Sequence, residues 1–137
     1  MIRNEDDLVR FLVGHCKQIE RLENSAKGGT PDTMIPCHSG WFWFELKVLH
    51  GNELIFQNTQ TAFFVKNCRL PRHLWAGVIV AKVHTLEGFV ISGNELLTWP
   101  KRPYAKGKTA ITVPNDIAMT GLRQLIDKIG VYTDIPS

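Results

Sequence analysis

Long apolar runs are missing from this sequence, since none approaches the roughly 20 residues that a membrane-spanning helix requires. A secretory start is missing too, because residues 1–7 carry three acidic side chains where a signal peptide has basic residues followed by an apolar stretch. From these two absences we expect neither a membrane-spanning helix nor a cleaved leader of the usual form. They predict an intracellular, cytoplasmic protein without membrane contacts.

Cysteine is scarce, and its spacing matters more than its number. Cys16, Cys37 and Cys68 cannot all pair within one chain, and none forms a CxxC motif. A disulfide framework is therefore excluded, and reduced thiols are the simpler interpretation. His15 beside Cys16 and Cys37 beside His38 lack the spacing of zinc ligands, so we do not expect a structural zinc site.

Internal repeats, heptads and low-complexity tracts are also absent. At 137 residues, with 44% hydrophobic and 21% charged residues, the chain has the size and composition of a single globular domain. Its formal net charge of +3 permits binding to a polyanion without requiring it.

Hydrophobic periodicity and capping residues predict an α/β fold. Helices are expected at residues 4–17, 59–69 and 118–129, with a helical turn at 94–99. Strands are expected at 33–37, 41–48, 76–83 and 88–91, with a short extended segment at 18–24 and a basic loop at 100–109. The first two full strands form a hairpin, whose second strand lies centrally in a mixed sheet flanked by the helices.

This predicted hairpin brings acidic residues together. Asp32 opens its first strand, and Glu45 and Lys47 lie on its second strand within a strongly apolar run. Side chains alternate along a strand, so Glu45 and Lys47 share one face while Leu46 packs into the core on the other. For Glu45 and Lys47, the alternative is a solvated strand face with an ion pair, which the apolar neighbours disfavour. For Asp32, the alternative is a turn residue after Pro31.

Two converging carboxylates favour a hard divalent cation, because the cation relieves their repulsion. Asp32 and Glu45 are the predicted ligands, and the backbone carbonyl of Leu46 is a candidate third oxygen. Mg²⁺ is the expected metal, with Mn²⁺ able to substitute. Lys47 then has two possible roles: to hold or deprotonate an attacking water, or to neutralise charge on a phosphate.

The combined pattern resembles a known family. Its parts are Arg21-x-Glu23-Asn24, Gly29-Thr30-Pro31-Asp32, Phe44-Glu45-Leu46-Lys47 and Gln60-x-x-Phe63, and together they resemble the VRR-NUC branch of the PD-(D/E)xK nucleases. The resemblance covers residues 1–85 as the family core, with 86–137 as a C-terminal extension of the same domain. It implies a restriction-endonuclease-like core and metal-dependent hydrolysis of phosphodiester bonds in DNA.

The resemblance also implies further site residues. An acidic residue on the first helix completes the metal site, which maps onto Glu5 with Asp6 as a competitor. A glutamine near the lysine maps onto Gln60, with Gln57 as a competitor. The alternative for Glu5 is a purely structural role, as an acid in the first turn that interacts favourably with the helix dipole. The alternative for Gln60 is an exposed helix residue without a role in the site.

Small members of this branch resemble phage-type homodimers that act on four-way (Holliday) junctions. The implied protein is then a dimeric junction resolvase, in the host cytoplasm if its source is viral. Candidate DNA-binding residues are the cations of the second helix and of the basic loop, with ordinary solvated charge as the alternative: Lys66, Arg69, Arg72, Lys101, Arg102, Lys106 and Lys108. Tyr104 is a candidate for stacking or wedging at a branch. Two other functions remain open: a non-cleaving nucleic-acid-binding or inhibitory protein on a nuclease scaffold, and a related nuclease with another DNA substrate.

Overall fold

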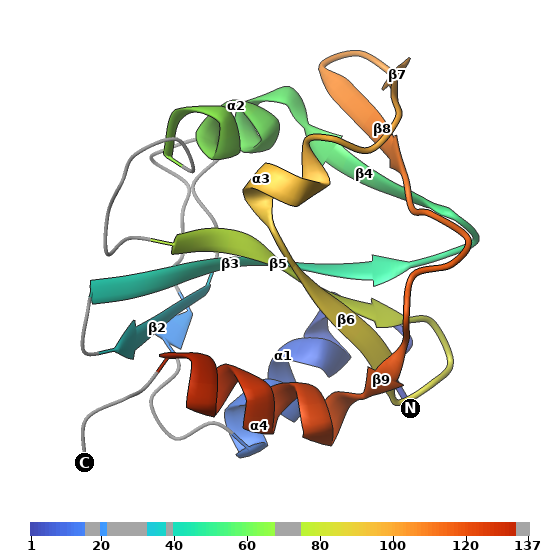
Figure 1. The fold of residues 1–137 in the computed structure, drawn as a ribbon. Coiled ribbons are helices and arrows are strands. Elements are labelled where there is room, and N and C mark those ends of the chain that lie inside the picture. The colour runs from blue at the N-terminus through green and yellow to red at the C-terminus, as the bar shows by residue number, and fades with distance from the viewer. Residues whose placement is uncertain (16–19, 22–32, 38–39, 68–74, 134–137) are drawn as a thin grey trace.

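The computed structural model describes residues 1–15, 20–21, 33–37, 40–67 and 75–133, and the fold follows from these (Figure 1). The helices are α1 (Glu5–His15), α2 (Asn58–Asn67), α3 (Gly93–Leu96) and α4 (Leu122–Thr133). The strands are β1 (Glu20–Arg21), β2 (Thr33–Cys37), β3 (Gly40–Leu49), β4 (Glu53–Gln57), β5 (Trp75–Lys82), β6 (Glu87–Ser92), β7 (Lys101–Tyr104), β8 (Lys108–Thr112) and β9 (Thr120–Gly121).

The main sheet is mixed and has the strand order β1-β2-β3-β5-β6-β9. Only the β3–β5 pair is parallel, and β3 lies between β2 and β5, as predicted for the second strand of the hairpin. Alternation along β3 directs Phe44 and Leu46 into one hydrophobic cluster and Leu49 into another. Both faces of the central strand are therefore covered, which explains its nearly continuous apolar sequence.

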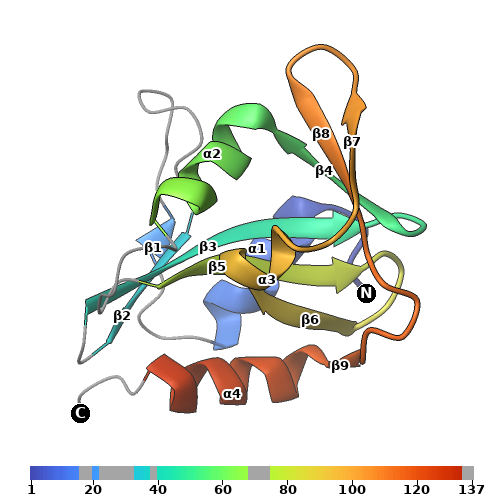
Figure 2. The ribbon, with the colours of Figure 1, turned by 45° about the horizontal axis from the view of Figure 1, so that its top comes forward.

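Helices cover the two faces of this sheet in pairs (Figures 1 and 2). Leu8 and Leu12 of α1 join Leu122 and Leu125 of α4 in the cluster under one face. Phe64 of α2 and Leu96 of α3 belong to the cluster on the other face. The predicted α/β class, with a mixed central sheet flanked by helices, is confirmed. None of the helices in the described part of the chain combines the length and the apolar character needed to cross a bilayer.

A second sheet, with the order β4-β8-β7, was not predicted. Residues 100–109, expected to be a basic loop, instead contain β7 and the start of β8, joined by a tight turn. Ala105 and Gly107 adopt positive φ angles of 43° and 75° in that turn, and only glycine adopts such angles without strain. β7, the first strand of this hairpin, contains Pro103, which is tolerated because β7 is an edge strand.

Helix boundaries also differ from the prediction. The last helix begins at Leu122 and not at residue 118, because Thr120 and Gly121 first pair with Glu87 and Gly88 as β9. The second helix begins at Asn58, so Thr59, the predicted cap, lies inside its first turn. The predicted helical turn at 94–99 is shorter and is capped by Ser92, whose hydroxyl oxygen accepts the N–H of Glu95.

Gly88 gives a test of the sheet register. A Cβ atom placed on Gly88 would lie 1.9 Å from the carbonyl oxygen of Val80 on the neighbouring strand, and a backbone atom cannot move aside as a side chain can. We expect Gly88→Ala to lower the free energy of unfolding by at least about 2 kcal/mol, measured by urea denaturation.

Gly14→Ala is the matched control, since nothing lies within 4 Å of a Cβ atom there and the residue is helical. This variant should be as stable as the parent or up to about 1 kcal/mol more stable. Equal stability of the Gly88 and Gly14 variants would contradict the described β5–β6 register.

Candidate active site on the central strand

Glu45 and Lys47 point from β3 towards the face covered by α2, as the alternation predicted. The Glu45 residue is only 5% exposed, and the Lys47 side chain is 17% exposed. The solvated strand face considered as the alternative is therefore wrong for both residues. A carboxylate buried in an apolar strand is costly unless partners are built around it.

Gln60 supplies such a partner from the first turn of α2. Its Nε2 donates to Glu45 Oε2 at 3.0 Å, and its Oε1 accepts the backbone N–H of Gln57 at 2.8 Å. The same Oε1 lies 3.5 Å from Lys47 Nζ. Of the two competing glutamines, Gln60 reaches the carboxylate and the lysine with its side chain, while the side chain of Gln57 is exposed.

Lys47 is fixed by three neighbours. Its Nζ lies 3.9 Å from Glu45 Oε2 and 3.5 Å from Gln60 Oε1, and it stands 4.8 Å from the centre of the Phe56 ring. The ammonium group is thereby held by a charge, a dipole and a π face at once. Such restraint preorganises a cation for binding developing negative charge.

An open hollow of about 560 Å³ adjoins Lys47 at the carboxyl end of β3. We call it the β3 hollow, and it is lined by Asn4, Glu5, Lys47, Val48, His50, Glu53, Ile55 and Tyr104. Its size falls within the range of about 300–1,000 Å³ typical of small-ligand sites. Glu5, which the family resemblance assigned to the metal site, thus lines the same hollow as Lys47.

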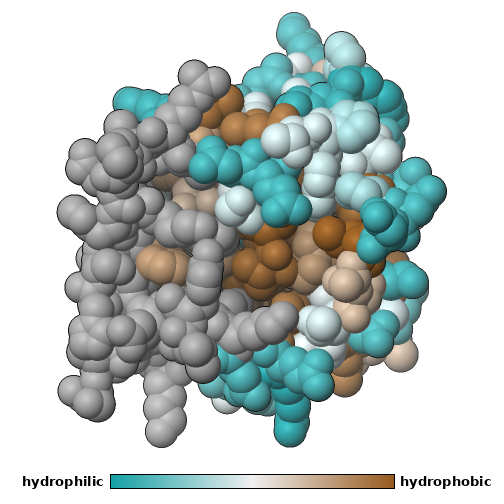
Figure 3. All heavy atoms as spheres, in the orientation of Figure 1, coloured by the Kyte–Doolittle hydropathy of each residue, from teal (hydrophilic) through white to brown (hydrophobic). Residues whose placement is uncertain are grey.

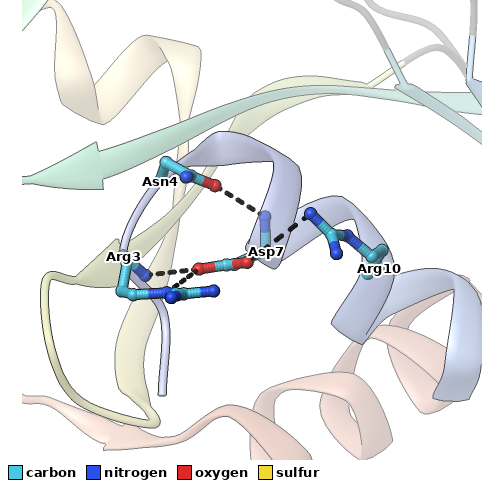
Figure 4. A network of polar contacts seen from close by, with 4 residues as sticks. All are labelled: Arg3, Asn4, Asp7 and Arg10. Atoms are coloured by element: carbon cyan, nitrogen blue, oxygen red, sulfur yellow. Dashed lines mark hydrogen bonds and ion pairs between the residues drawn. The ribbon is translucent and has the colours of Figure 1, made fainter.

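The start of α1 is held by a polar network of Arg3, Asn4, Asp7 and Arg10 (Figure 4). Asn4 Oδ1 accepts the N–H of Asp7 at 2.9 Å and so caps the helix, as the sequence predicted. Asp7 Oδ2 accepts the backbone N–H of Arg3 at 2.9 Å and its Nε–H at 3.1 Å. Arg10 adds an ion pair at 3.7 Å. These contacts fix the helical turn that includes Glu5, which lines the β3 hollow.

Several predicted site residues cannot be placed. Asp32, Arg69 and Arg72 lie outside the described residues, as do Glu23 and Asn24 of the family pattern. Thr33, which follows Asp32 in the chain, is buried and pairs with Phe44, the neighbour of Glu45. Leu46, whose carbonyl was a candidate ligand, has its side chain in the core. Among residues with described positions, no group of three or more His, Cys, Asp or Glu side chains is arranged to hold a metal ion.

The predicted DNA-binding cations fall into two groups. Lys101 Nζ donates to the carbonyls of Leu97 and Trp99, and Arg102 forms a two-pronged ion pair with Glu53. Lys66, Lys106 and Lys108 form the second group, and like Lys101 and Arg102 they are exposed. Figure 3 shows hydrophilic side chains gathered over the projecting β7–β8 hairpin.

His50, Glu53 and Phe56 were missed by the sequence analysis. The buried Leu54 and Phe56 alternate with less buried positions in β4, a signal that could have revealed this strand. The pairing of Glu53 with Arg102 spans 49 positions and depends on the β4-β8-β7 order, so no local pattern predicts it.

The Gln60–Glu45 contact predicts the effect of one substitution. Gln60→Glu replaces the amide donor by a second carboxylate against Glu45 Oε2, and we expect the free energy of unfolding to fall by about 1–3 kcal/mol at pH 7. At acid pH the loss of unfolding free energy in this variant should be smaller, because protonation of one carboxylate removes the repulsion between the two.

Thr59→Glu is the control for this experiment, because it adds the same charge to the same exposed helical turn. This change should cost little, since an acid near a helix N-terminus is favourable. Equal losses in both variants, measured by urea denaturation, would argue against the described contact.

The network at α1 predicts a pH dependence. Hydrogen bonds from Arg3 hold the pKa of Asp7 below its ordinary range. A carboxyl whose pKa is lower in the folded state stabilises above its ordinary pKa, and that stabilisation is lost as pH falls through the lowered value. Asp7→Asn should therefore lower the Tm at pH 7, and the difference from the parent should shrink as the pH falls below about 4 and vanish below the lowered pKa. Asp6→Asn, which removes a charge from the same turn, should have the smaller effect at pH 7.

The sequence matches no protein-family model and no curated protein sequence. Among solved structures, it is similar to the 1.6 Å structure of Hjc from Archaeoglobus fulgidus, a Holliday junction resolvase from an archaeal hyperthermophile. The TM-score is 0.53 at 11% sequence identity, over 90% of this chain and 95% of that chain. The chain therefore shares the fold of Hjc, with a mixed central sheet flanked by helices.

Proposed function

We propose that this chain is a metal-dependent, structure-selective DNA endonuclease of the PD-(D/E)xK type, similar to the VRR-NUC branch, that cleaves four-way junctions. The observation that carries the proposal is the cluster of a buried Glu45 with the half-buried Lys47 and Gln60, on a fold shared with a Holliday junction resolvase. A buried carboxylate held next to an ammonium group, with the lysine lining an open hollow, suits the hydrolysis of a phosphodiester.

The chemistry of the available donors fits a hard cation. Glu45 offers a buried carboxylate, and Glu5 offers another at the β3 hollow, so the described acidic donors are oxygens of the kind that Mg²⁺ or Mn²⁺ prefers. Asp32 is proposed as a further ligand, supported by its place next to Thr33, which pairs beside Glu45. The Leu46 carbonyl is the remaining candidate. When bound, the metal supplies Lewis-acid activation of water and of the phosphate.

The protein's own groups have distinct proposed roles. Lys47 carries its charge to the edge of the β3 hollow, where it neutralises charge on the phosphate or holds the attacking water. Gln60 fixes the carboxylate of Glu45 in one orientation, because its two polar atoms are both engaged. Lys66, Lys106 and Lys108 are exposed and are proposed to contact the phosphate backbone.

A single nuclease domain over residues 1–137 is supported by the sheet. β6 and β9 lie beyond residue 85, yet they extend the main sheet, since β6 pairs with β5 and β9 pairs with β6. We also propose a homodimer, since a two-fold symmetric pair presents two such sites to the two strands of a junction.

The test is cleavage of end-labelled DNA with Mg²⁺ or Mn²⁺. We expect paired incisions in a four-way junction and much slower cutting of linear duplex and of single strand. Glu45→Gln, Asp32→Asn and Lys47→Ala should each lower the rate by at least about 100-fold. Removal of the metal with EDTA should abolish cutting.

Glu95→Gln is the matched control, because it makes the same chemical change at an exposed position of α3. It should leave the rate unchanged. Equal cutting of all substrates would support a nuclease but contradict the proposed junction preference. If the folded protein binds DNA but cuts it with neither metal, the enzyme proposal is wrong and a DNA-binding protein is indicated.

A further inference from the structure

The β7–β8 hairpin, residues 101–112, lies beside the β3 hollow. Tyr104, the last residue of β7, lines this hollow together with Lys47 and Glu5, although nearly sixty positions separate Tyr104 from Lys47. One face of the small sheet directs Leu54, Phe56 and Ile111 into the core. Side chains alternate along a strand, so Ile55 and Tyr104 lie on the opposite face, and both line the hollow. The face that bears Tyr104 is thus one side of the candidate active site.

The hairpin is joined to the helix that carries Gln60. The carbonyl of Gly107, in the turn, accepts the backbone N–H of Asn58 at 2.9 Å, and Thr109 Oγ1 donates to Asn58 Oδ1 at 2.6 Å. Asn58 is the first residue of α2, two positions before Gln60. Two hydrogen bonds to the first residue of α2 therefore link the hairpin to the helix whose Gln60 contacts Glu45.

Arg102 restrains Tyr104. Its Nε and Nη2 donate to the two carboxylate oxygens of Glu53 at 2.9 and 2.7 Å, and its Cζ lies 5.4 Å from the centre of the Tyr104 ring. The charge of Arg102 thus has a partner within the protein, in accord with the lowered pKa of Glu53 beside it. Arg102 is better suited to hold the tyrosine ring than to bind phosphate.

The tyrosine itself is available to a ligand. Tyr104 is 39% exposed, so part of its side chain is accessible to a ligand in the hollow. Lys108, its partner across the hairpin, and Lys106 in the turn are exposed cations. An exposed ring flanked by cations is the arrangement by which proteins hold a nucleotide, since the ring stacks on the base and the cations follow the backbone.

We infer that Tyr104 stacks on an unpaired or unstacked nucleotide next to the cleaved phosphodiester and so determines the preference for branched DNA. This inference rests on the proposed nuclease function and adds the specificity-determining residue. A base inside a continuous duplex is stacked on its neighbours, so extracting it costs free energy. The cost is smaller at a branch point, because bases there are already partly unstacked. Glu53 and Arg102 act as positioning residues for the ring, and Lys106 and Lys108 bind the backbone of either form of DNA.

The experiment measures binding apart from cleavage. Fluorescein-labelled four-way junction and linear duplex of the same sequence are titrated with protein in EDTA, and the Kd is read from anisotropy. Tyr104→Ala should weaken junction binding by about 5- to 150-fold and duplex binding by less than about twofold. Tyr104→Phe keeps the ring and should match the parent, and Leu86→Ala, an exposed apolar residue outside the hollow, is the control.

Two further variants separate positioning from charge. Glu53→Gln removes the anchor of Arg102 without removing a cation, and it should lower the junction-to-duplex preference. Lys106→Ala combined with Lys108→Ala should weaken both complexes alike and reduce the slope of log Kd against log salt by about 1.8 on duplex. With Mg²⁺, the incisions of Tyr104→Ala should spread over neighbouring phosphodiesters.

The outcomes separate the inference from the proposed function. If the parent cuts junctions and Tyr104→Ala retains the parental preference while folded by its thermal unfolding profile, the inference is overturned and the nuclease stands. If Tyr104 governs junction binding but nothing is cut, the inference stands and the nuclease falls. If the parent binds neither DNA, both are wrong.

Discussion

The burial of one carboxylate, that of Glu45, constrains much of the structure around it. A charge removed from water costs several kcal/mol unless groups of opposite polarity meet it. Lys47 lies two residues along the same strand, so the strand supplies one partner without help from the fold. The other partner, Gln60, must come from elsewhere, and it reaches Glu45 only because β4 ends and α2 begins directly above β3. The turn at Gln57, whose N–H holds Gln60, is therefore as much a part of the site as the charged residues.

The small sheet follows from the same constraint. β4 returns the chain from β3 to the start of α2, and its own unpaired edge is completed by β8 and then β7. Phe56 of β4 serves two purposes, since its ring packs in the core and faces the ammonium group of Lys47. The core and the candidate site thus share Phe56, so a change in the packing under β4 alters the surroundings of Lys47.

Much of this arrangement was accessible from the sequence. The apolar run of β3 and the helical spacing of α1 gave clear periodicities, and the alternation placed Glu45 and Lys47 on one face and Leu46 on the other. β4 was missed because it is short and follows β3 closely, so its alternation merged with the preceding strand. The β7–β8 hairpin was taken for a loop because lysines and a proline dominate its composition, and these mark an edge strand as readily as a loop. Contacts such as Glu53–Arg102 depend on pairing between distant strands, which periodicity does not encode. The placement of Asp32 remains a prediction.

The hairpin has a consequence for how such a protein can change over time. All residues of 101–108 are exposed, whereas the core is closed by Ile111 and the residues of β4. Substitutions, or even insertions, in this segment leave the buried packing and the Glu45 cluster intact, provided that the bonds to Asn58 persist. Substrate preference and chemistry can therefore drift independently within one small fold. Under the proposed function, the hairpin is the segment in which related sequences should diverge first and the one to exchange when redesigning specificity.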